Sequence, residues 1–214
     1  MELVKQQSVA SHFLAELRDV DVQKDPMRFR RNLERIGEVL ALELSRTLEY
    51  EDGEVTTPLG VARTRRLAEQ PVLATILRAG LPMHQGLLNY FDRADNAFIS
   101  AYRKHRKGEE GFDIEVEYLS SPSLHDRTLV ICDPMLATGQ SMVLVYKALL
   151  RLGKPKSVHI VSAIASVEGV EYAKLHLPPG TRFWIGAIDE EMTAQAYIVP
   201  GLGDAGDLAY GNKM

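Results

Sequence analysis

The chain has 214 residues, of which 45% are hydrophobic, and its 25 basic and 29 acidic residues leave a formal net charge of −4. This size and apolar content are enough for one well-packed domain, and the slight negative charge argues against a surface that wraps a nucleic-acid backbone. No run approaches the roughly 20 apolar residues of a membrane helix, and residues 1–13 lack the pattern of a signal peptide. We therefore expect a soluble, cytoplasmic protein with no nucleic-acid or membrane partner.

The only cysteine, Cys132, lies in the apolar run TLVIC. One cysteine permits no intramolecular disulfide and no CxxC or Cys/His zinc site. The six histidines have no i, i+4 partner that would suggest a metal-binding helix. We expect Cys132 to be a small buried hydrophobic residue and the protein to contribute no metal site of its own.

The first quarter of the chain contains a helical pattern. Apolar side chains recur there at three- and four-residue steps: Leu33, Ile36, Leu40, Leu44 and Leu48. This spacing predicts an amphipathic helix that ends near Tyr50 and is stopped by Asp52 and Gly53. Residues 55–60, VTTPLG, are interpreted as a loop, and residues 1–57 are expected to form an N-terminal helical arm.

From residue 72 onward, short apolar runs alternate with helical patterns. The apolar runs lie at 72–80, 96–102, 127–133, 157–166 and 182–189, and the helical patterns at 81–91, 138–153 and 168–176. Such alternation is typical of an α/β fold with a mainly parallel sheet and helices on both of its faces. No linker divides the chain, so we expect one domain over residues 1–214.

The alternation breaks between residues 103 and 126. This stretch carries charge clusters, Gly108 and Gly111, and a period-two segment, FDIEVEY, at 112–118. The pattern predicts a projecting β-hairpin or a mobile flap. A long excursion of this kind in a compact α/β domain is often functional.

The segment after TLVIC indicates an anion site. A buried strand ends at Asp133, a loop of mostly small residues follows, and a helix begins near Ser141. The first backbone N–H groups of a helix lack internal partners, and the helix dipole is positive at that end, so a phosphate can bind there. Thr138 and Ser141 add hydroxyl donors, whereas the acceptor Asp133 suits the hydroxyl groups of a ribose. The alternative is an ordinary strand-to-helix turn with a capping Thr or Ser.

A second glycine-rich segment, GLGDAGD at 201–207, fits the G-x-G-x-x-G pattern of dinucleotide-binding turns. That fingerprint also needs an acidic residue about 20 positions later, and only eight residues follow Gly206. We therefore do not expect NAD binding. The glycines are interpreted as allowing the backbone to fold tightly around a flat base.

The string DPMLATG at 133–139, followed by Ser141, resembles the phosphoribosyl diphosphate (PRPP) loop of phosphoribosyltransferases and, in particular, of the uracil phosphoribosyltransferase family. The resemblance continues in matching order over about three-quarters of the chain. Its further matches are ILRAGL at 76–81, AYR at 101–103, EG at 168–169 and YIVPGLGDAGD at 197–207. It implies the phosphoribosyltransferase-like fold, with a flexible hairpin flap at 103–126 and a C-terminal hood at 178–214.

The resemblance also implies roles for individual residues. The residues expected to bind PRPP are Arg78, Arg103, Asp133, Pro134, Met135, Leu136, Ala137, Thr138, Gly139, Gln140, Ser141 and Asp204. The uracil site is expected to comprise Ile198, Gly203, Asp204 and Ala205. Arg78, Arg103, Asp133 and Asp204 are the residues expected to act in catalysis.

The reaction implied is the conversion of uracil and PRPP to UMP and diphosphate, with Mg²⁺ bound mainly through PRPP and with the protein as a homodimer or larger homo-oligomer. The alternatives are an RNA-binding regulator of the same fold that senses uracil nucleotides, and a transferase for another nucleobase. The chain departs from the family pattern at Gln140, where a second glycine is usual, and at Pro134, where many related transferases have an acid.

Overall fold

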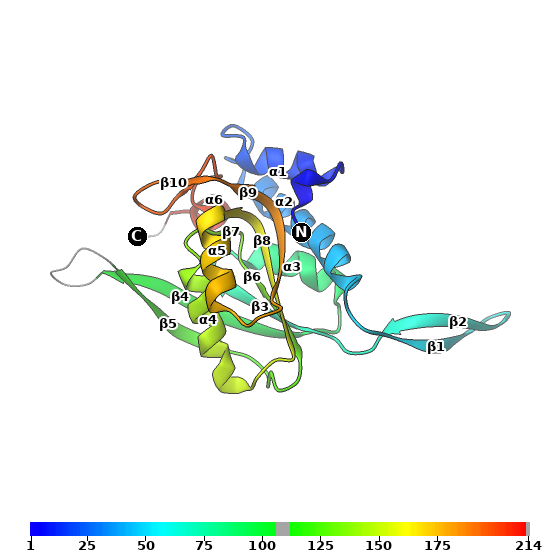
Figure 1. The fold of residues 1–214 in the computed structure, drawn as a ribbon. Helices are drawn as coiled ribbons and strands as arrows, with labels where there is room; N and C mark the ends of the chain where they lie inside the picture. Colours follow the sequence, from blue (N-terminus) through cyan, green and yellow to red (C-terminus); the bar gives the residue numbers. More distant parts are fainter. Residues whose placement is uncertain (106–111, 213–214) are drawn as a thin grey trace.

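The structure, a computed structural model, describes residues 1–105 and 112–212 and has a seven-stranded central sheet (Figure 1). The strand order is β5-β4-β3-β6-β8-β7, with β9 also paired to β8. Its strands are β3 (Val72–Leu77), β4 (Asp95–His105), β5 (Phe112–Ser120), β6 (Thr128–Cys132), β7 (Met135–Leu136), β8 (Ser157–Ser166) and β9 (Arg182–Asp189). All pairs are parallel except β4–β5, which confirms the predicted mainly parallel α/β sheet.

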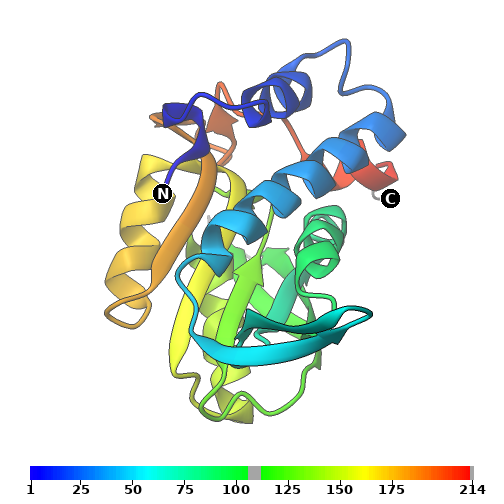
Figure 2. The same cartoon turned by 90° about the vertical axis from the view of Figure 1, so that its right-hand side faces the viewer.

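Helices cover both faces of this sheet (Figures 1 and 2). One face carries α1 (Ala10–Arg18), α2 (Pro26–Ser45) and α3 (Leu81–Tyr90), and the other carries α4 (Gln140–Leu149) and α5 (Val167–His176). Short 3₁₀ turns lie at Leu3–Lys5 (η1) and Leu150–Leu152 (η2). None of the helices in the described part of the chain is long and apolar enough to cross a membrane.

The strands alternate their side chains between two apolar layers. In β6, Val130 and Cys132 pack with α2 and α3, whereas Leu129 and Ile131 pack with α4. Successive side chains of a strand point to opposite faces, and a strand covered on both faces reads as a continuous apolar run. Cys132 is a free and buried thiol, as the sequence predicts.

The N-terminal quarter differs from the prediction. Helix α2 ends at Ser45 rather than near Tyr50, and the chain then forms a two-stranded antiparallel hairpin of β1 (Tyr50–Thr57) and β2 (Gly60–Leu67). The predicted loop at 55–60 is therefore wrong, because only residues 58–59 form the turn. The hairpin projects from the body of the molecule (Figure 1) and has no buried face, so its sequence lacks the apolar alternation that identifies a strand.

Strands β4 and β5 form the antiparallel pair that FDIEVEY predicts. Their register runs from Phe98 opposite Ser120 to His105 opposite Phe112, with a bulge between Ser100 and Ala101. Residues 106–111, which include both glycines, lie outside the described residues. The motion of the segment as a flap stays a prediction.

The chain after β9 leaves the sheet. It forms the two-residue strands β10 (Glu191–Met192) and β11 (Ile198–Val199), which pair with each other, and the short helix α6 (Ala205–Tyr210). Ile198, Leu202, Ala205 and Ala209 are buried in the same apolar cluster as α2. Because β9 belongs to the sheet, only the part of the expected hood after Asp189 lies outside it.

Candidate active site

A cavity of about 460 Å³ lies where the carboxyl ends of β3 and β6 meet the C-terminal segment. Three parts of the chain line it: the end of β3 and Ala79 after it, most of residues 133–142 in the loop and the first turn of α4, and two stretches at 195–197 and 203–206. Ligands of open α/β sheets bind outside the carboxyl ends of the strands. The cavity therefore lies where this fold places a substrate.

The loop after β6 has the geometry that the sequence predicts. Helix α4 begins at Gln140, within one residue of the expected start, and its N-cap is Gly139 with a left-handed φ of 75°. The Thr138 hydroxyl accepts a hydrogen bond from the Gln140 N–H at 3.4 Å. Apart from this contact, the first turn of α4 has no side-chain cap, so its amides are available to an anion.

Asp133 directly follows the last residue of β6 and lines the cavity. Its backbone N–H donates to the Val161 carbonyl at 3.1 Å, which continues the sheet pairing by one residue. Burial raises the pKa of the Asp133 carboxyl from 3.8 to about 7, against a smaller opposing effect of a hydrogen bond from the Met135 N–H. Among the described residues no Lys or Arg forms an ion pair with it. Asp133 is thus half-buried, with a carboxyl that faces the cavity and accepts few hydrogen bonds from the protein.

The loop is held from behind by α5. The Ser166 hydroxyl donates to the Ala137 carbonyl and accepts from the Gly169 N–H, the latter at 2.8 Å. A Cβ on Gly169 would collide with the Ala137 and Leu136 carbonyl oxygens. Sequence reasoning did not explain why the family motif at 168–169 contains glycine. The structure gives a steric reason: only glycine at 169 lets α5 approach the loop so closely.

Arg78 follows β3 across a cis Leu77–Arg78 peptide bond. Its side chain lies against α6, where Nη2 is 3.3 Å from the Asp207 carboxylate and 3.0 Å from the Gly211 carbonyl oxygen. Arg78 stands beside the cavity without lining it. Arg103 lies in β4, opposite Ile114 of β5.

The C-terminal segment closes the cavity with residues that were predicted and others that were not. Gly203, Asp204 and Ala205 line it as expected, whereas Ile198 is buried in β11 behind it. Gly201 and Gly203 have positive φ, in agreement with a tightly folded backbone. A short helix, α6, opens inside the glycine segment, which sequence reasoning did not foresee. Residues 195–197 also line the cavity, although only Tyr197 belongs to the segments that resemble the uracil phosphoribosyltransferase family.

The structure thus gathers most of the predicted site around one cavity. The members that line it are Asp133, Met135, Leu136, Ala137, Thr138, Gly139, Ser141, Gly203, Asp204 and Ala205. Pro134 and Gln140 belong to the loop without lining the cavity: Pro134 is buried and accepts a hydrogen bond from the Ile164 N–H, and Gln140 is exposed. Within the described ranges, no group of three or more His, Cys, Asp or Glu side chains is placed to hold a metal ion.

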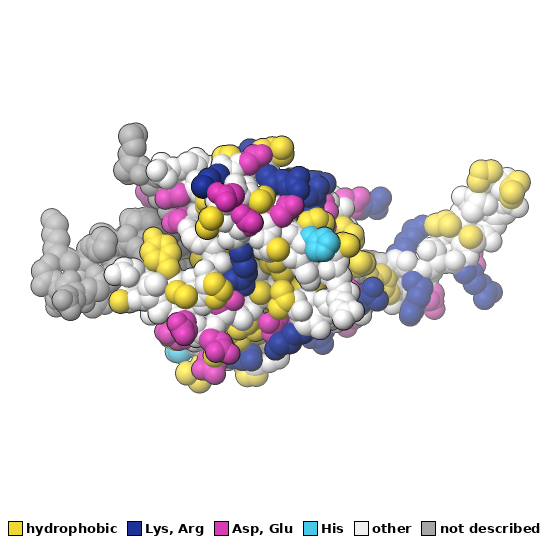
Figure 3. Space-filling model, turned by 90° about the horizontal axis from the view of Figure 1, so that it is seen from above, with side chains coloured by type: hydrophobic (Ala, Val, Ile, Leu, Met, Phe, Trp, Pro, Cys, Tyr) yellow, Lys and Arg dark blue, Asp and Glu magenta, His cyan; other side chains and the backbone are white. Residues whose placement is uncertain are grey.

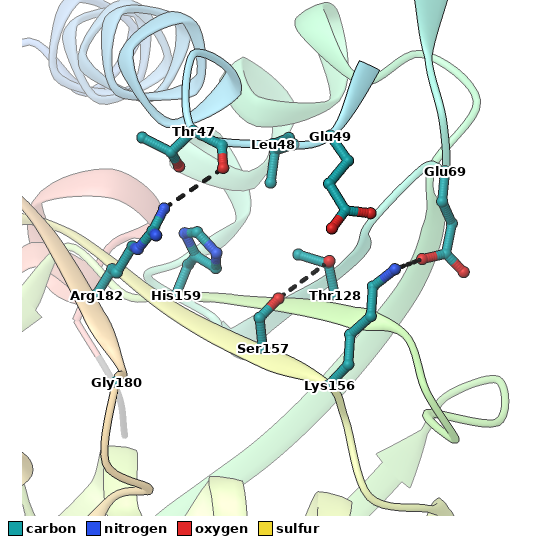
Figure 4. A pocket seen from close by; sticks show the side chains of 10 residues that line it. All are labelled: Thr47, Leu48, Glu49, Glu69, Thr128, Lys156, Ser157, His159, Gly180 and Arg182. Carbon is teal, nitrogen blue, oxygen red and sulfur yellow. Dashed lines mark hydrogen bonds and ion pairs between the residues drawn. The ribbon is translucent and has the colours of Figure 1, made fainter. Parts of the chain in front are cut away.

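A second cavity of about 400 Å³ opens at the opposite edge, at the amino ends of β6, β8 and β9 (Figure 4). Its polar groups largely bond one another: Lys156 pairs with Glu69 at 2.8 Å, and the Ser157 hydroxyl donates to that of Thr128 at 3.1 Å. Arg182 donates to the Thr47 carbonyl at 3.4 Å. This cavity lies away from Asp133 and from every predicted site residue.

Comparisons with known proteins agree with this geometry. The family model described as uracil phosphoribosyltransferase matches residues 4–212. A uracil phosphoribosyltransferase of Porphyromonas gingivalis is 54% identical over 214 residues, which cover 100% of this chain and 99% of the relative. One from Methanothermobacter thermautotrophicus is 39% identical over 189 residues, or 87% and 85% of the two chains.

Solved structures share the fold. A protein of Aquifex aeolicus superposes with a TM-score of 0.86 at 30% identity, over 99% of this chain and 97% of the other. An orotate phosphoribosyltransferase of Mycobacterium tuberculosis, solved with PRPP, has a TM-score of 0.51 at 12% identity, over 86% and 90% of the two chains, and supports the fold alone. On the family match and the full-length relatives, the chain belongs to the uracil phosphoribosyltransferase family.

Proposed function

We propose that this protein transfers the phosphoribosyl group of PRPP to N1 of uracil and so produces UMP and diphosphate, a salvage reaction for a pyrimidine base. One observation carries the proposal: the half-buried carboxyl of Asp133 and the N-terminus of α4, whose N-cap Gly139 has no side chain, line a single cavity with residues 203–205. These three parts match the two substrates: Asp133 can accept hydrogen bonds from the ribose hydroxyls, the N-terminus of α4 can bind the 5-phosphate, and the backbone of residues 203–205 can bind the base.

PRPP is bound from both ends of its ribose. The Asp133 carboxylate accepts hydrogen bonds from the ribose hydroxyls, and the 5-phosphate occupies the N-terminus of α4, where Thr138 and Ser141 add hydroxyl donors. Arg78 provides a cation for the diphosphate from the end of β3, and the family resemblance assigns Arg103 to the same group.

Uracil is recognised by backbone groups of the C-terminal segment, at Ile198 and at Gly203 to Ala205. A fixed carbonyl accepts from uracil N3–H, and fixed N–H groups donate to the uracil carbonyl oxygens. Cytosine presents the reverse pattern at N3 and at its exocyclic group. A peptide group cannot exchange its donor for an acceptor, so cytosine would leave buried polar groups unpaired, which can be worth about 10⁴-fold in discrimination.

Charge stabilisation is the main catalytic task. As the bond from C1′ to the diphosphate breaks, negative charge grows on the leaving group. Arg78 is a cation beside the cavity, since its Nη2 lies 3.9 Å from where a Cβ on the lining residue Gly206 would be. Two carboxylates, Asp133 and Asp204, line the cavity, and carboxylate and phosphate oxygens are ligands that Mg²⁺ accepts. Mg²⁺ bound mainly through PRPP would neutralise charge on the departing diphosphate. No protein nucleophile is needed.

Location and assembly are inferred from the family resemblance. We propose a cytoplasmic protein that forms a homodimer or a larger homo-oligomer, a state that sedimentation equilibrium measures.

No nucleic-acid partner is proposed: on the face shown in Figure 3, basic and acidic side chains are interspersed, without a continuous basic surface.

The deciding experiment supplies PRPP and Mg²⁺ with uracil, cytosine, xanthine or hypoxanthine and measures nucleotide and diphosphate. We expect turnover with uracil alone and a loss of about 100-fold in kcat/KM for Asp133→Asn, the scale of one lost polar contact in the transition state. Asp92→Asn, which removes an exposed carboxylate, is the matched control. Turnover of another base would reassign the substrate, and no turnover with any base would favour a regulator over an enzyme.

A further inference from the structure

The position of the Arg78 guanidinium depends on the C-terminal helix. Nη2 bonds the Asp207 carboxylate at 3.3 Å and the Gly211 carbonyl oxygen at 3.0 Å. Nε is buried and has no hydrogen-bond partner among the described residues. Both contacts that orient the guanidinium therefore come from α6 and the residue that ends it.

Asp207 is itself fixed by a residue of the cavity. The Asp204 carboxylate accepts a hydrogen bond from the Asp207 backbone N–H at 3.0 Å and so caps α6. Between them, Gly206 packs closely: a Cβ there would lie 3.2 Å from Asp204 Oδ1 and 3.9 Å from Arg78 Nη2. One turn of helix thus joins the base-binding segment to the arginine expected to bind diphosphate.

We propose that Asp207 is a positioning residue that holds Arg78 for the leaving diphosphate and, through α6, couples that arginine to the segment that binds uracil. This inference rests on the proposed function, because it assigns Arg78 to the diphosphate. Both side chains of the pair are about one-third exposed, at 39% for Arg78 and 33% for Asp207. A pair so exposed is weak on its own, but Asp207 bonds only Nη2, and a guanidinium carries five N–H donors. Arg78 can therefore donate its remaining N–H groups to the diphosphate while Asp207 keeps its orientation.

Removing the Asp207 charge has two opposing effects on PRPP binding. The guanidinium loses orientation, which weakens the contact, and the diphosphate loses a repelling carboxylate, which strengthens it. The two effects offset each other in the bound ground state. Orientation matters more as charge develops on the leaving group, so the loss should fall on kcat rather than on KM.

The test is steady-state kinetics of Asp207→Asn with PRPP and uracil. We expect kcat to fall about 10-fold, a fraction of the 10²–10³-fold loss typical for removing a whole charge-stabilising donor, and KM for PRPP to change less than about 3-fold. The conservative variant Asp207→Glu should stay within about 3-fold of the wild type in kcat. The matched control is Asp95→Asn, which breaks another exposed arginine pair, that of Arg127 at 3.0 Å, far from the cavity.

A double-mutant cycle with Arg78→Lys separates positioning from a merely structural role. If Asp207 acts through Arg78, the Asp207→Asn change should cost less than about 2-fold in kcat once Arg78 is a lysine. An equal loss in both backgrounds, or no loss in the wild-type background, would overturn the proposal. If the wild type itself makes no UMP, the proposed function fails instead, and the two failures are therefore distinct.

Discussion

The carboxyl of Asp133 lies where burial favours its neutral form, yet its proposed partners, the ribose hydroxyls, are best bound by the charged form. Burial raises its pKa from 3.8 to about 7. In the unfolded chain the carboxyl has its ordinary pKa, so between about pH 4 and 7 the folded protein holds a proton that the unfolded chain has lost. The free energy of unfolding must therefore decrease as the pH rises through this window.

Asp133→Asn should remove this pH dependence, because the amide stays neutral at every pH. We expect the variant to exceed the wild type in free energy of unfolding by up to ~4 kcal/mol at pH 8, since one pKa unit corresponds to ~1.4 kcal/mol, and by only ~1 kcal/mol at pH 4.5. Urea unfolding at the two pH values measures the difference. The exposed Asp92→Asn should behave alike at both, and an equal gain for Asp133→Asn at both pH values would contradict the role of charge.

Single residues were predictable from sequence where their chemistry is local. Asp133, Thr138 and Ser141 follow from a strand, a loop and a helix start in succession. Gly169 and Asp207 belong to matched motifs, but no role was assigned to them because their contacts are long-range: Gly169 leaves space for a carbonyl oxygen of residue 137, and Asp207 bonds an arginine 129 positions away in the chain. Neither a steric limit nor a distant ion pair leaves a pattern in the neighbouring residues.

Elements were predictable in proportion to how completely they are buried. The strands β3, β6 and β8 are covered on both faces and read as apolar runs. The β1–β2 hairpin is largely exposed, and its residues 51–54, EDGE, are poor strand formers, so nothing in the sequence marked it. Helix α2 was predicted too long because Leu48 continues the apolar spacing, although it lies after the helix end and packs on the core from there.

The distal half of the β4–β5 pair has the structure expected of a segment that can close. Pairing of β4 with β3 ends at Ser100, whereas β4 continues to His105 with β5 as its only described strand partner. A two-stranded ribbon without a third strand is marginally stable in water. We therefore predict that this part of the sheet can change its exposure without disturbing the parallel core.

Binding of PRPP should slow amide exchange in this ribbon. With PRPP and Mg²⁺ we expect peptides covering 101–120 to exchange at least about 5-fold more slowly, because closure over the diphosphate orders both strands and excludes water. Hydrogen-exchange mass spectrometry measures the change. The β1–β2 hairpin, also two-stranded but projecting on the opposite side of the molecule (Figure 1), is the internal control and should be unaffected. Unchanged exchange over 101–120 would rule out closure.

The cavity joins parts of the whole molecule that are far apart in sequence. Its lining comes from within residues 76–79, 133–142, 195–197 and 203–206, so a PRPP molecule bound there would bridge the sheet, the N-terminus of α4 and the C-terminal segment. The amino edge of the sheet, where the second cavity lies, contributes nothing to it (Figure 4). Because a ligand bound there holds these parts together, its binding should raise the free energy of unfolding of the whole domain.

Thermal unfolding should show that PRPP stabilises the folded protein and that this stabilisation depends on Mg²⁺. PRPP at 100 times its Kd adds about 2.7 kcal/mol to the free energy of unfolding, which for a domain of this size raises Tm by roughly 5–10 °C. With EDTA in place of Mg²⁺ we expect less than half of that shift, because Asp133 and Asp204 then face an uncompensated diphosphate across the same cavity. Ribose 5-phosphate, which lacks the diphosphate, is the control ligand, and its smaller shift should not depend on the metal. An equal PRPP shift with and without Mg²⁺ would mean that the arginines alone neutralise the leaving group, so that the metal has no part in binding.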